Sequence, residues 1–367
     1  MKINYERRWN EIKKNLDEKD AFITSRPGNT RYLGNSDSPP GCPPSSTMNF
    51  VVIPKKGDPI AITSSLEEHR CREESSIDDI RLWTLYPDIK SDGKTALDVL
   101  KNTLNEKKIS SVYVDSKIRL GRGIKPFKND FVTEMRGVKT KDELERIMKA
   151  IKQSDAGQEF ARNLVECGEG LTEREVRTEI DYFMGRNGIQ ENSFTTIIAS
   201  GPNAAHSHHS NTNRKLESGD SVICDFGVFW DGYCSDITRT YALGNNIDER
   251  LLKAYDAVRL ANQTGRKKAK IGVKAGDVDS ATRKVIEDYG FGEFFTHRTG
   301  HGLGLEIHEE PYIKPESDFI LKKGMTFTIE PGIYIPDLGG IRIEDDVCLS
   351  SSGLVSLTNL PRDLVIV

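Results

Sequence analysis

The chain has 367 residues, enough for two domains, and 36% of them are apolar, which is typical of a soluble protein with a sizeable core. A net charge of −4 and the lack of a basic stripe exclude nucleic-acid binding as the main function. No apolar run approaches the ~18 residues of a membrane span, and the charged first residues are unlike a secretory signal.

The cysteines predict a cytoplasmic protein. Six of them, at positions 42, 71, 167, 224, 234 and 348, are scattered without a CxxC spacing. This distribution excludes a zinc finger and a disulfide framework. We therefore expect reduced, mostly buried thiols.

Residues 1–128 alternate strand-like and helix-like runs, which predicts an α/β domain. A turn at 55–58 joins two of the strands. The run 36–46 is rich in proline and serine and predicts a stiff, exposed loop. The expected strands are 22–24, 32–33, 49–53, 60–63 and 112–114, and the expected helices are 65–74 and 95–105.

The stretch 121–130 has little apolar content and predicts a boundary, giving domains 1–128 and 129–367. Capping boxes that begin at Thr140 and Thr172 predict helices to about 167 and 187. Helices and strands then occur in separate runs, which predicts an α+β second domain. The further expected helices are 248–269 and 277–289, and the expected strands are 194–199, 222–229, 237–243, 326–335 and 340–349.

An Asp-Gly pair at 231–232 between strand-like runs is the strongest short signal for a two-residue hairpin loop. Such a loop places Gly227 opposite Asp236 in the ladder. Asp225 then lies on the same face as Asp236 and diagonal to it. The two carboxylates are therefore expected to converge on one cation.

A second carboxylate pair, Glu330 and Glu344, flanks a loop that contains residues 336–340. A loop of three or five residues leaves both glutamates on one face of the hairpin. Their neighbours are mostly apolar, so ionised carboxylates there are costly unless cations pair with them.

Together with one histidine, these acids form a donor set for two divalent cations. A helix cap or a salt bridge explains most single acids, but two same-face pairs and a glycine-flanked histidine favour metal binding. Oxygen-rich ligation with one imidazole favours Mn²⁺ or Co²⁺, with Zn²⁺ or Fe²⁺ as alternatives. Two cations about 3.5–4 Å apart lower the pKa of a shared water and polarise a carbonyl, which points to amide-bond hydrolysis. The five candidates are Asp225, Asp236, His301, Glu330 and Glu344.

A cluster of three histidines lies at 206, 208 and 209. From the residues alone this segment is an exposed turn, a metal site or a loop that faces a substrate, and all three interpretations stay open.

The order and spacing of the five candidates resemble those of the pita-bread metallopeptidases, peptidase family M24. The aspartates lie 11 residues apart, the glutamates 14 apart, and the histidine lies in Gly-His-Gly-Leu-Gly at 300–304. The whole chain is similar to the Xaa-Pro peptidase branch, prolidase and aminopeptidase P, most strongly over 200–346. The resemblance implies an α+β pita-bread (creatinase/aminopeptidase-like) catalytic domain after a smaller α/β domain of the creatinase N-terminal, ribonuclease H-like type.

The resemblance also implies how the metals are shared. Asp225 is expected on one metal, His301 and Glu330 on the other, and Asp236 and Glu344 on both.

Further roles follow from the same resemblance. Glu330 is the expected proton shuttle, from the attacking water to the leaving proline nitrogen. His308 is expected to stabilise the tetrahedral intermediate, and His208 to approach the substrate's proline or carbonyl. Tyr334 and Arg342 are expected to hold the first aspartate ligand in place.

One position departs from the family. Dipeptide-specific members often have an arginine after the His-Glu-x-Pro motif, and here Tyr312 stands there. The change removes a clamp for a free substrate carboxylate and favours longer peptides, unless another arginine such as Arg298 substitutes.

The implied partners are proline-containing peptides and a second copy of the chain, with the loop 39–44 as a candidate contact. Methionine aminopeptidases share the metal set but do not need the N-terminal domain. Creatinase-like hydrolases lack the ligands. A non-catalytic peptide- or protein-binding module is the alternative from another class, and the intact ligand set argues against it.

Overall fold

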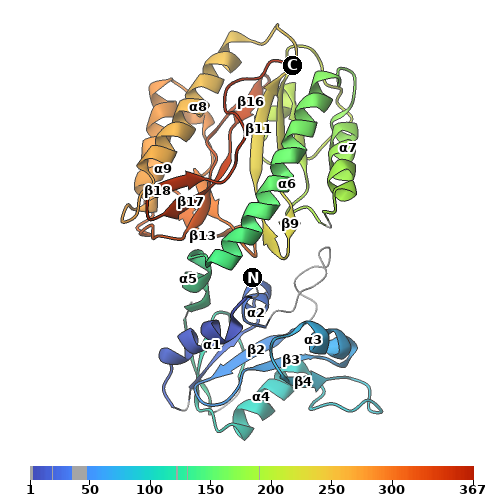
Figure 1. Ribbon diagram of the computed structural model, residues 1–367, viewed down its shortest axis with the longest axis vertical. Helices are drawn as coiled ribbons and strands as arrows, with labels where there is room; N and C mark the ends of the chain where they lie inside the picture. Colours follow the sequence, from blue (N-terminus) through green and yellow to red (C-terminus); the bar gives the residue numbers. More distant parts are fainter. Residues whose placement is uncertain (1–2, 19, 35–47, 121–122, 130, 190) are drawn as a thin grey trace. The chain divides into compact units, whose positions relative to one another are not determined.

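The computed structural model describes residues 3–18, 20–34, 48–120, 123–129, 131–189 and 191–367. The chain divides into two compact units, Met1–Arg136 and Gly137–Val367 (Figure 1). We expected a boundary at 128/129, and the observed division falls eight residues later, before the last residue of helix α5 (Phe131–Gly137). The loop expected at 36–46 lies outside the described residues.

The first unit is a mixed six-stranded sheet with helices, as expected for an α/β domain. The strand order is β4-β3-β2-β1-β5-β6, in which β1 pairs antiparallel with β2 and parallel with β5. The strands are β1 (Asp20–Thr24), β2 (Phe50–Pro54), β3 (Ile60–Ser64), β4 (Asp79–Trp83), β5 (Ser111–Val114) and β6 (Lys125–Lys128). The longer helices are α1 (Tyr5–Lys14), α2 (Pro27–Gly34), α3 (Glu68–Glu74) and α4 (Ala96–Glu106).

The expected strand at 32–33 is wrong, because these residues belong to helix α2. Pro27 is the first residue of that helix, where its fixed φ is favourable. Tyr32 and Leu33 are buried, and Arg8 stacks on the Tyr32 ring at 3.7 Å. A buried turn of helix and a short buried strand have the same apolar signature over two residues.

The second unit has two helix pairs that flank its strands (Figure 1). The capping boxes at Thr140 and Thr172 are confirmed, and both predicted helices follow them. The helices are α6 (Lys141–Glu166), α7 (Glu173–Arg186), α8 (Glu249–Lys268) and α9 (Ala275–Asp288). Gly290, with φ +84°, follows α9 and ends it in the left-handed conformation that glycine adopts readily.

Three of the expected strands of the second unit are interrupted. The run 222–229 divides into β8 (Ser221–Phe226) and β9 (Phe229–Trp230). The run 326–335 divides into β14 (Thr326–Ile329) and β15 (Gly332–Ile335), and 340–349 into β16 (Gly339–Arg342) and β17 (Asp345–Ser350). The other strands are β7 (Ile197–Ser200), β10 (Tyr233–Cys234), β11 (Ile237–Ala242), β12 (Gly300–Gly302), β13 (Glu309–Ile313) and β18 (Gly353–Ser356).

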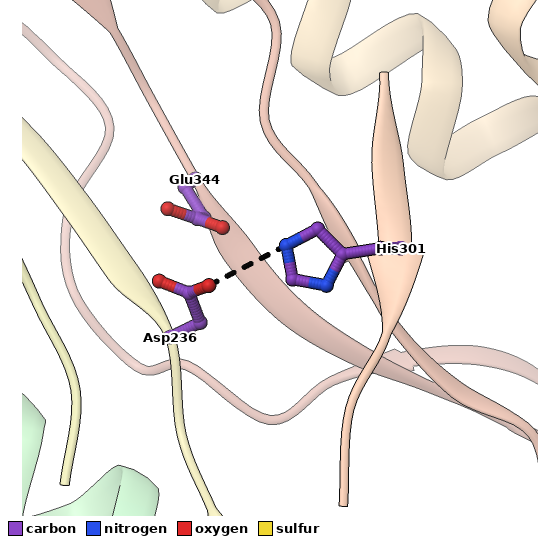
Figure 2. Close-up of side chains that lie close together, drawn as sticks. All are labelled: Asp236, His301 and Glu344. Carbon is purple, nitrogen blue, oxygen red and sulfur yellow. Dashed lines mark ion pairs between the residues drawn. The ribbon is translucent and has the colours of Figure 1, made fainter. Parts of the chain in front are cut away.

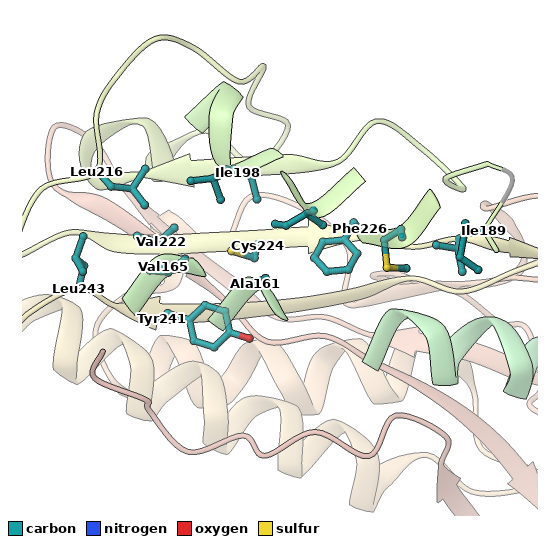
Figure 3. Packing of buried hydrophobic residues seen from close by; sticks show 14 of the residues in the cluster. Ala161, Val165, Ile189, Ile198, Leu216, Val222, Cys224, Phe226, Tyr241 and Leu243 are labelled. Carbon is teal, nitrogen blue, oxygen red and sulfur yellow. The ribbon is translucent and has the colours of Figure 1, made fainter. Parts of the chain in front are cut away.

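Apolar cores fix the sheets against the helices. One cluster lies between α6, α7 and the sheet β11-β8-β7, with Phe226 and Val222 among its members (Figure 3). A second joins α8 to β15 and β16. The strands that carry the candidate ligands therefore lie in the interior of the second unit. Among the described residues, no helix is long and apolar enough to cross a membrane.

Candidate metal centre

The first predicted hairpin consists of two short ladders, one between β9 and β10 and one between β8 and β11. Both ladders follow the same pairing register. Trp230 pairs with Tyr233 beside the loop, and Asp225 pairs with Thr238 beyond the gap, in the same register. The expected diagonal placement of Asp225 and Asp236 is confirmed. Gly227 is required at the gap, because a Cβ there would lie 1.8 Å from a backbone oxygen.

The second hairpin behaves in the same way. An inner ladder pairs Ile329 with Asp345, and an outer ladder pairs Gly332 with Arg342 in the same register. Residues 330 and 344 lie opposite each other in the gap between the two ladders. The three-residue loop 336–338 thus leaves both glutamates on one face, as expected.

His301 lies in β12, the strand next to β14. Its glycine neighbours permit close packing of the strands: a Cβ on Gly300 would lie 2.0 Å from the Thr328 carbonyl oxygen, and one on Gly302 2.3 Å from that of Glu310. The Gly-His-Gly sequence therefore brings the imidazole into the middle of the sheet.

The imidazole faces the carboxylates (Figure 2). His301 Nε2 lies 3.5 Å from Asp236 Oδ2 and 3.3 Å from Glu330 Oε1. Its Nδ1 donates to the Gly302 carbonyl at 3.1 Å, which leaves the Nε2 lone pair directed at the acids. Ligand atoms of Asp236, His301 and Glu344 all lie within 4.8 Å of one another, the spacing of a shared cation.

These side chains line a cavity of about 540 Å³ in which the five candidate ligands, His208, His308 and Arg342 meet. The apolar lining consists of Phe194, Ile197 and Ile307, and the rest is Ser207, His297, Arg298 and Lys314. Of the residues expected in the site, Tyr312 and Tyr334 do not line the cavity but contact residues that do.

The crowding of buried carboxylates in the cavity favours the binding of cations. Burial, followed by the charges of neighbouring acids, raises the pKa of Asp236 and of Glu344 well above their usual range. Burial raises the pKa of Glu330 to about 7. Among the described residues, Asp225 Oδ1 and Glu344 Oε1 are buried without a hydrogen-bond partner. Orphaned carboxylate oxygens that face one cavity fit divalent cations.

A chain of hydrogen bonds supports the first aspartate. Arg342 donates to Asp225 Oδ2 at 2.5 Å and to the Tyr334 hydroxyl at 2.8 Å. His297 Nδ1 donates to the Arg298 carbonyl at 2.8 Å, so its Nε2 accepts the Tyr334 proton at 2.8 Å. Burial lowers the pKa of His297 to about 3, which keeps it in this neutral form. Sequence reasoning anticipated Arg342 and Tyr334 but not His297.

The loop between β7 and β8 carries His208 and is held by the buried Glu173, a second residue that sequence reasoning missed. Both carboxylate oxygens of Glu173 accept hydrogen bonds of 2.7–3.0 Å from the loop. Burial alone favours a raised pKa for Glu173, but these hydrogen bonds lower it. The donors are Ser200, Asn203, His209 and Thr212.

His208 and His308 are exposed at the cavity mouth. The His308 ring meets the His301 ring edge-on at 4.3 Å between centroids. Partial burial, then the charges of His301 and Arg298, lower the pKa of His308 to about 4. A neutral His308 at pH 7 is a hydrogen-bond donor and acceptor rather than a cation.

Comparison with known proteins agrees with this architecture. A model of metallopeptidase family M24 matches residues 145–351. The chain is 35% identical to the Xaa-Pro dipeptidase of Pyrococcus furiosus, over 98% of this chain and 99% of that protein.

Solved structures resemble the chain over nearly its full length. The Xaa-Pro dipeptidase from Bacillus anthracis matches with a TM-score of 0.87 and 30% identity, over 99% of this chain and 100% of that one. The X-Pro aminopeptidase from Thermotoga maritima matches with a TM-score of 0.81 and 31% identity, over 97% and 100%. The expected pita-bread catalytic domain and N-terminal α/β domain are confirmed. The chain belongs to metallopeptidase family M24, in its prolidase and aminopeptidase P branch.

Proposed function

We propose that this protein is a dinuclear-metal peptidase that hydrolyses the Xaa-Pro bond at the N-terminus of peptides. The observation that supports it most is the convergence of five ligand-type side chains on one cavity whose mouth carries two further histidines. Asp225 would hold one metal, His301 and Glu330 the other, and Asp236 and Glu344 both. Mn²⁺ or Co²⁺ suits this oxygen-rich set best.

The bound cations supply polarisation of the scissile carbonyl and a lowered pKa for the attacking water. Glu330 accepts the water's proton and delivers it to the proline nitrogen, since its carboxylate lies in the cavity, 3.3 Å from His301 Nε2. His308 and His208 donate hydrogen bonds to the carbonyl oxygen as negative charge develops there. The apolar lining of Phe194 and Ile307 accommodates the substrate's side chains.

A direct assay tests the proposal. Purified protein loaded with Mn²⁺ or Co²⁺ is expected to cleave an Xaa-Pro dipeptide or an Xaa-Pro-Xaa tripeptide, and a chelator is expected to abolish both activities. Cleavage that survives metal removal contradicts the mechanism. Cleavage of an N-terminal Met-Ala bond without any Xaa-Pro cleavage favours a methionine aminopeptidase-like activity, and peptide binding with no cleavage favours the non-catalytic module.

We also propose that the chain works as a cytoplasmic homodimer. The cysteines of the described residues are all free, which suits a reducing compartment. Light scattering after gel filtration is expected to give twice the chain mass of 41.1 kDa. A mass of one chain at micromolar concentration contradicts the dimer.

A further inference from the structure

We propose that Arg298, stacked on Tyr312, is the residue that binds the free carboxylate of the substrate and makes Xaa-Pro dipeptides the preferred class. The inference rests on the proposed function and concerns its substrate length. It reverses the expectation that Tyr312 in place of an arginine favours longer peptides.

Two cationic side chains line the cavity besides Arg342. They are Arg298, which is half-buried, and Lys314, which is exposed. Arg342 is occupied by Asp225 and Tyr334. Neither of the other two forms an ion pair with any acid in the described part of the chain. A cation beside so many carboxylates, yet bound to none, is available to an anion from the substrate.

The backbone that carries Arg298 is fixed from helix α9. Arg283 donates to the carbonyls of residues 295 and 297, each at 2.8 Å. Asp279 accepts the Thr299 N–H at 3.0 Å. His297 donates to the Arg298 carbonyl itself. The residue is thus held in place on both sides, which reduces the entropy that binding must remove.

The side chain is held as well. The Arg298 guanidinium lies over the Tyr312 ring, 4.8 Å from its centroid, within the range of a cation–π contact. Tyr312 is the direct cross-strand partner of His301, so both side chains lie on the same face. Stacking by one face leaves the edge of the guanidinium free for two parallel hydrogen bonds to a carboxylate.

An ammonium is a weaker candidate for this task. Lys314 is exposed, and its flexible point charge cannot form the paired hydrogen bonds of a planar guanidinium. The geometry therefore assigns the clamp to Arg298 and its orientation to Tyr312.

The test compares an Xaa-Pro dipeptide with the same dipeptide amide, which lacks the carboxylate charge. The wild type is expected to prefer the acid by about 10- to 100-fold in kcat/KM, mainly through KM. Arg298→Gln is expected to remove this preference, with a larger loss of kcat/KM for the acid than for the amide. Arg298→Lys is expected to restore only part of it, because the bidentate contact is lost.

Tyr312 is tested by a conservative pair. Tyr312→Phe keeps the ring and is expected to keep the preference, whereas Tyr312→Leu is expected to reduce it. The matched control is Arg186→Gln, because Arg186 also stacks on a tyrosine, Tyr182, but on the outer surface of α7. This control is expected to behave as wild type with both substrates.

Several outcomes overturn the clamp. Equal losses for acid and amide in Arg298→Gln assign that residue a general role in the site. Loss of the preference in Lys314→Gln but not in Arg298→Gln moves the clamp to Lys314. A wild type that cleaves both substrates equally refutes the clamp alone, whereas one that cleaves neither refutes the proposed function.

Discussion

The carboxylates of Asp236 and Glu344 illustrate how much a single charge matters in this cavity. Each is buried and each is proposed to bind both metals. Asp236→Asn or Glu344→Gln is expected to lower kcat by about 10³-fold or more, since several kcal/mol of transition-state stabilisation depend on the metals. Activity and metal content are measured on the same samples. The control is Asp231→Asn in the exposed hairpin loop, because asparagine tolerates the positive φ of 50° found there.

A failure to fold would not explain the expected loss. Burial and neighbouring acids oppose the ionisation of Asp236, so a neutral isostere relieves that cost and the metal-free variant is expected to melt above the metal-free wild type at pH 7. Retained metal content together with full activity in either variant contradicts the bridging roles.

The hydroxyl of Tyr334 links Arg342 to His297. Tyr334→Phe is expected to lower kcat by about 10- to 100-fold, because Asp225 is then less firmly oriented. Titration with Mn²⁺ is expected to show weaker binding as well, which a purely local packing defect does not predict. The matched control is Tyr182→Phe, which removes a tyrosine hydroxyl bonded to an arginine on the surface. Unchanged metal affinity in Tyr334→Phe contradicts the orienting role.

At this scale the sequence and its family resemblance predict the acids, the histidine, Arg342 and Tyr334, but not the supporting residues His297 and Glu173. The acids follow from a local hairpin register, which a period of two and an Asp-Gly loop determine. His297 becomes visible only when a contact with Tyr334, 37 positions away, is known. Glu173 likewise acts on a loop that begins 27 positions later.

Among the elements, the loop after β7 depends most on one residue. Glu173→Gln keeps one oxygen but loses the charge and the acceptors for three of the six hydrogen bonds. We expect a KM increase of about 10-fold, since His208 is then less well positioned. Hydrogen exchange at Ser200 and Thr212 is expected to accelerate. Glu179→Gln, on the exposed face of the same helix, is the matched control. Normal exchange in the loop of Glu173→Gln contradicts the prediction.

Helices and strands could be predicted where the sequence signal comes from residues close together in the chain. Capping boxes define the starts of α6 and α7, because the reciprocal hydrogen bonds involve residues three apart. The sequence analysis ran strands through residues 330 and 344, although Pro331 lacks the N–H that a ladder requires and so signals the first interruption. Helix α1 was missed because its run of charged residues buries only Arg8 and Ile12.

For the molecule as a whole, the acids couple stability to pH. The pKa of Glu330 is raised from 4.5 to about 7 in the folded, metal-free protein. At this group the folded state then binds more protons than the unfolded state, so the contribution of Glu330 to stability falls as pH rises from 4.5 to 7. Divalent cations bind the ionised carboxylates, so their stabilisation grows with pH.

Thermal melting measures both trends. In chelator-treated samples, the melting temperature of the wild type is expected to fall relative to that of Glu330→Gln as the pH rises from 4.5 to 7, and Mn²⁺ is expected to raise the wild type's melting temperature more at pH 7 than at pH 4.5. Hydrogen exchange is expected to show protection by Mn²⁺ within Gly137–Val367 and none within Met1–Arg136. A chelator-treated wild type that loses no stability relative to Glu330→Gln over this range contradicts the account.

The paired ladders of the second hairpin have a consequence for how this enzyme tolerates change. The inner ladder of β14 and β17 ends at the pair Ile329 and Asp345, directly beside residues 330 and 344, and so sets their register from the side remote from the tip. Insertions at the tip, next to Asp337, are therefore expected to leave the catalytic geometry intact. A longer segment can therefore be inserted at the tip, by evolution or by design, with the arrangement of the catalytic residues retained.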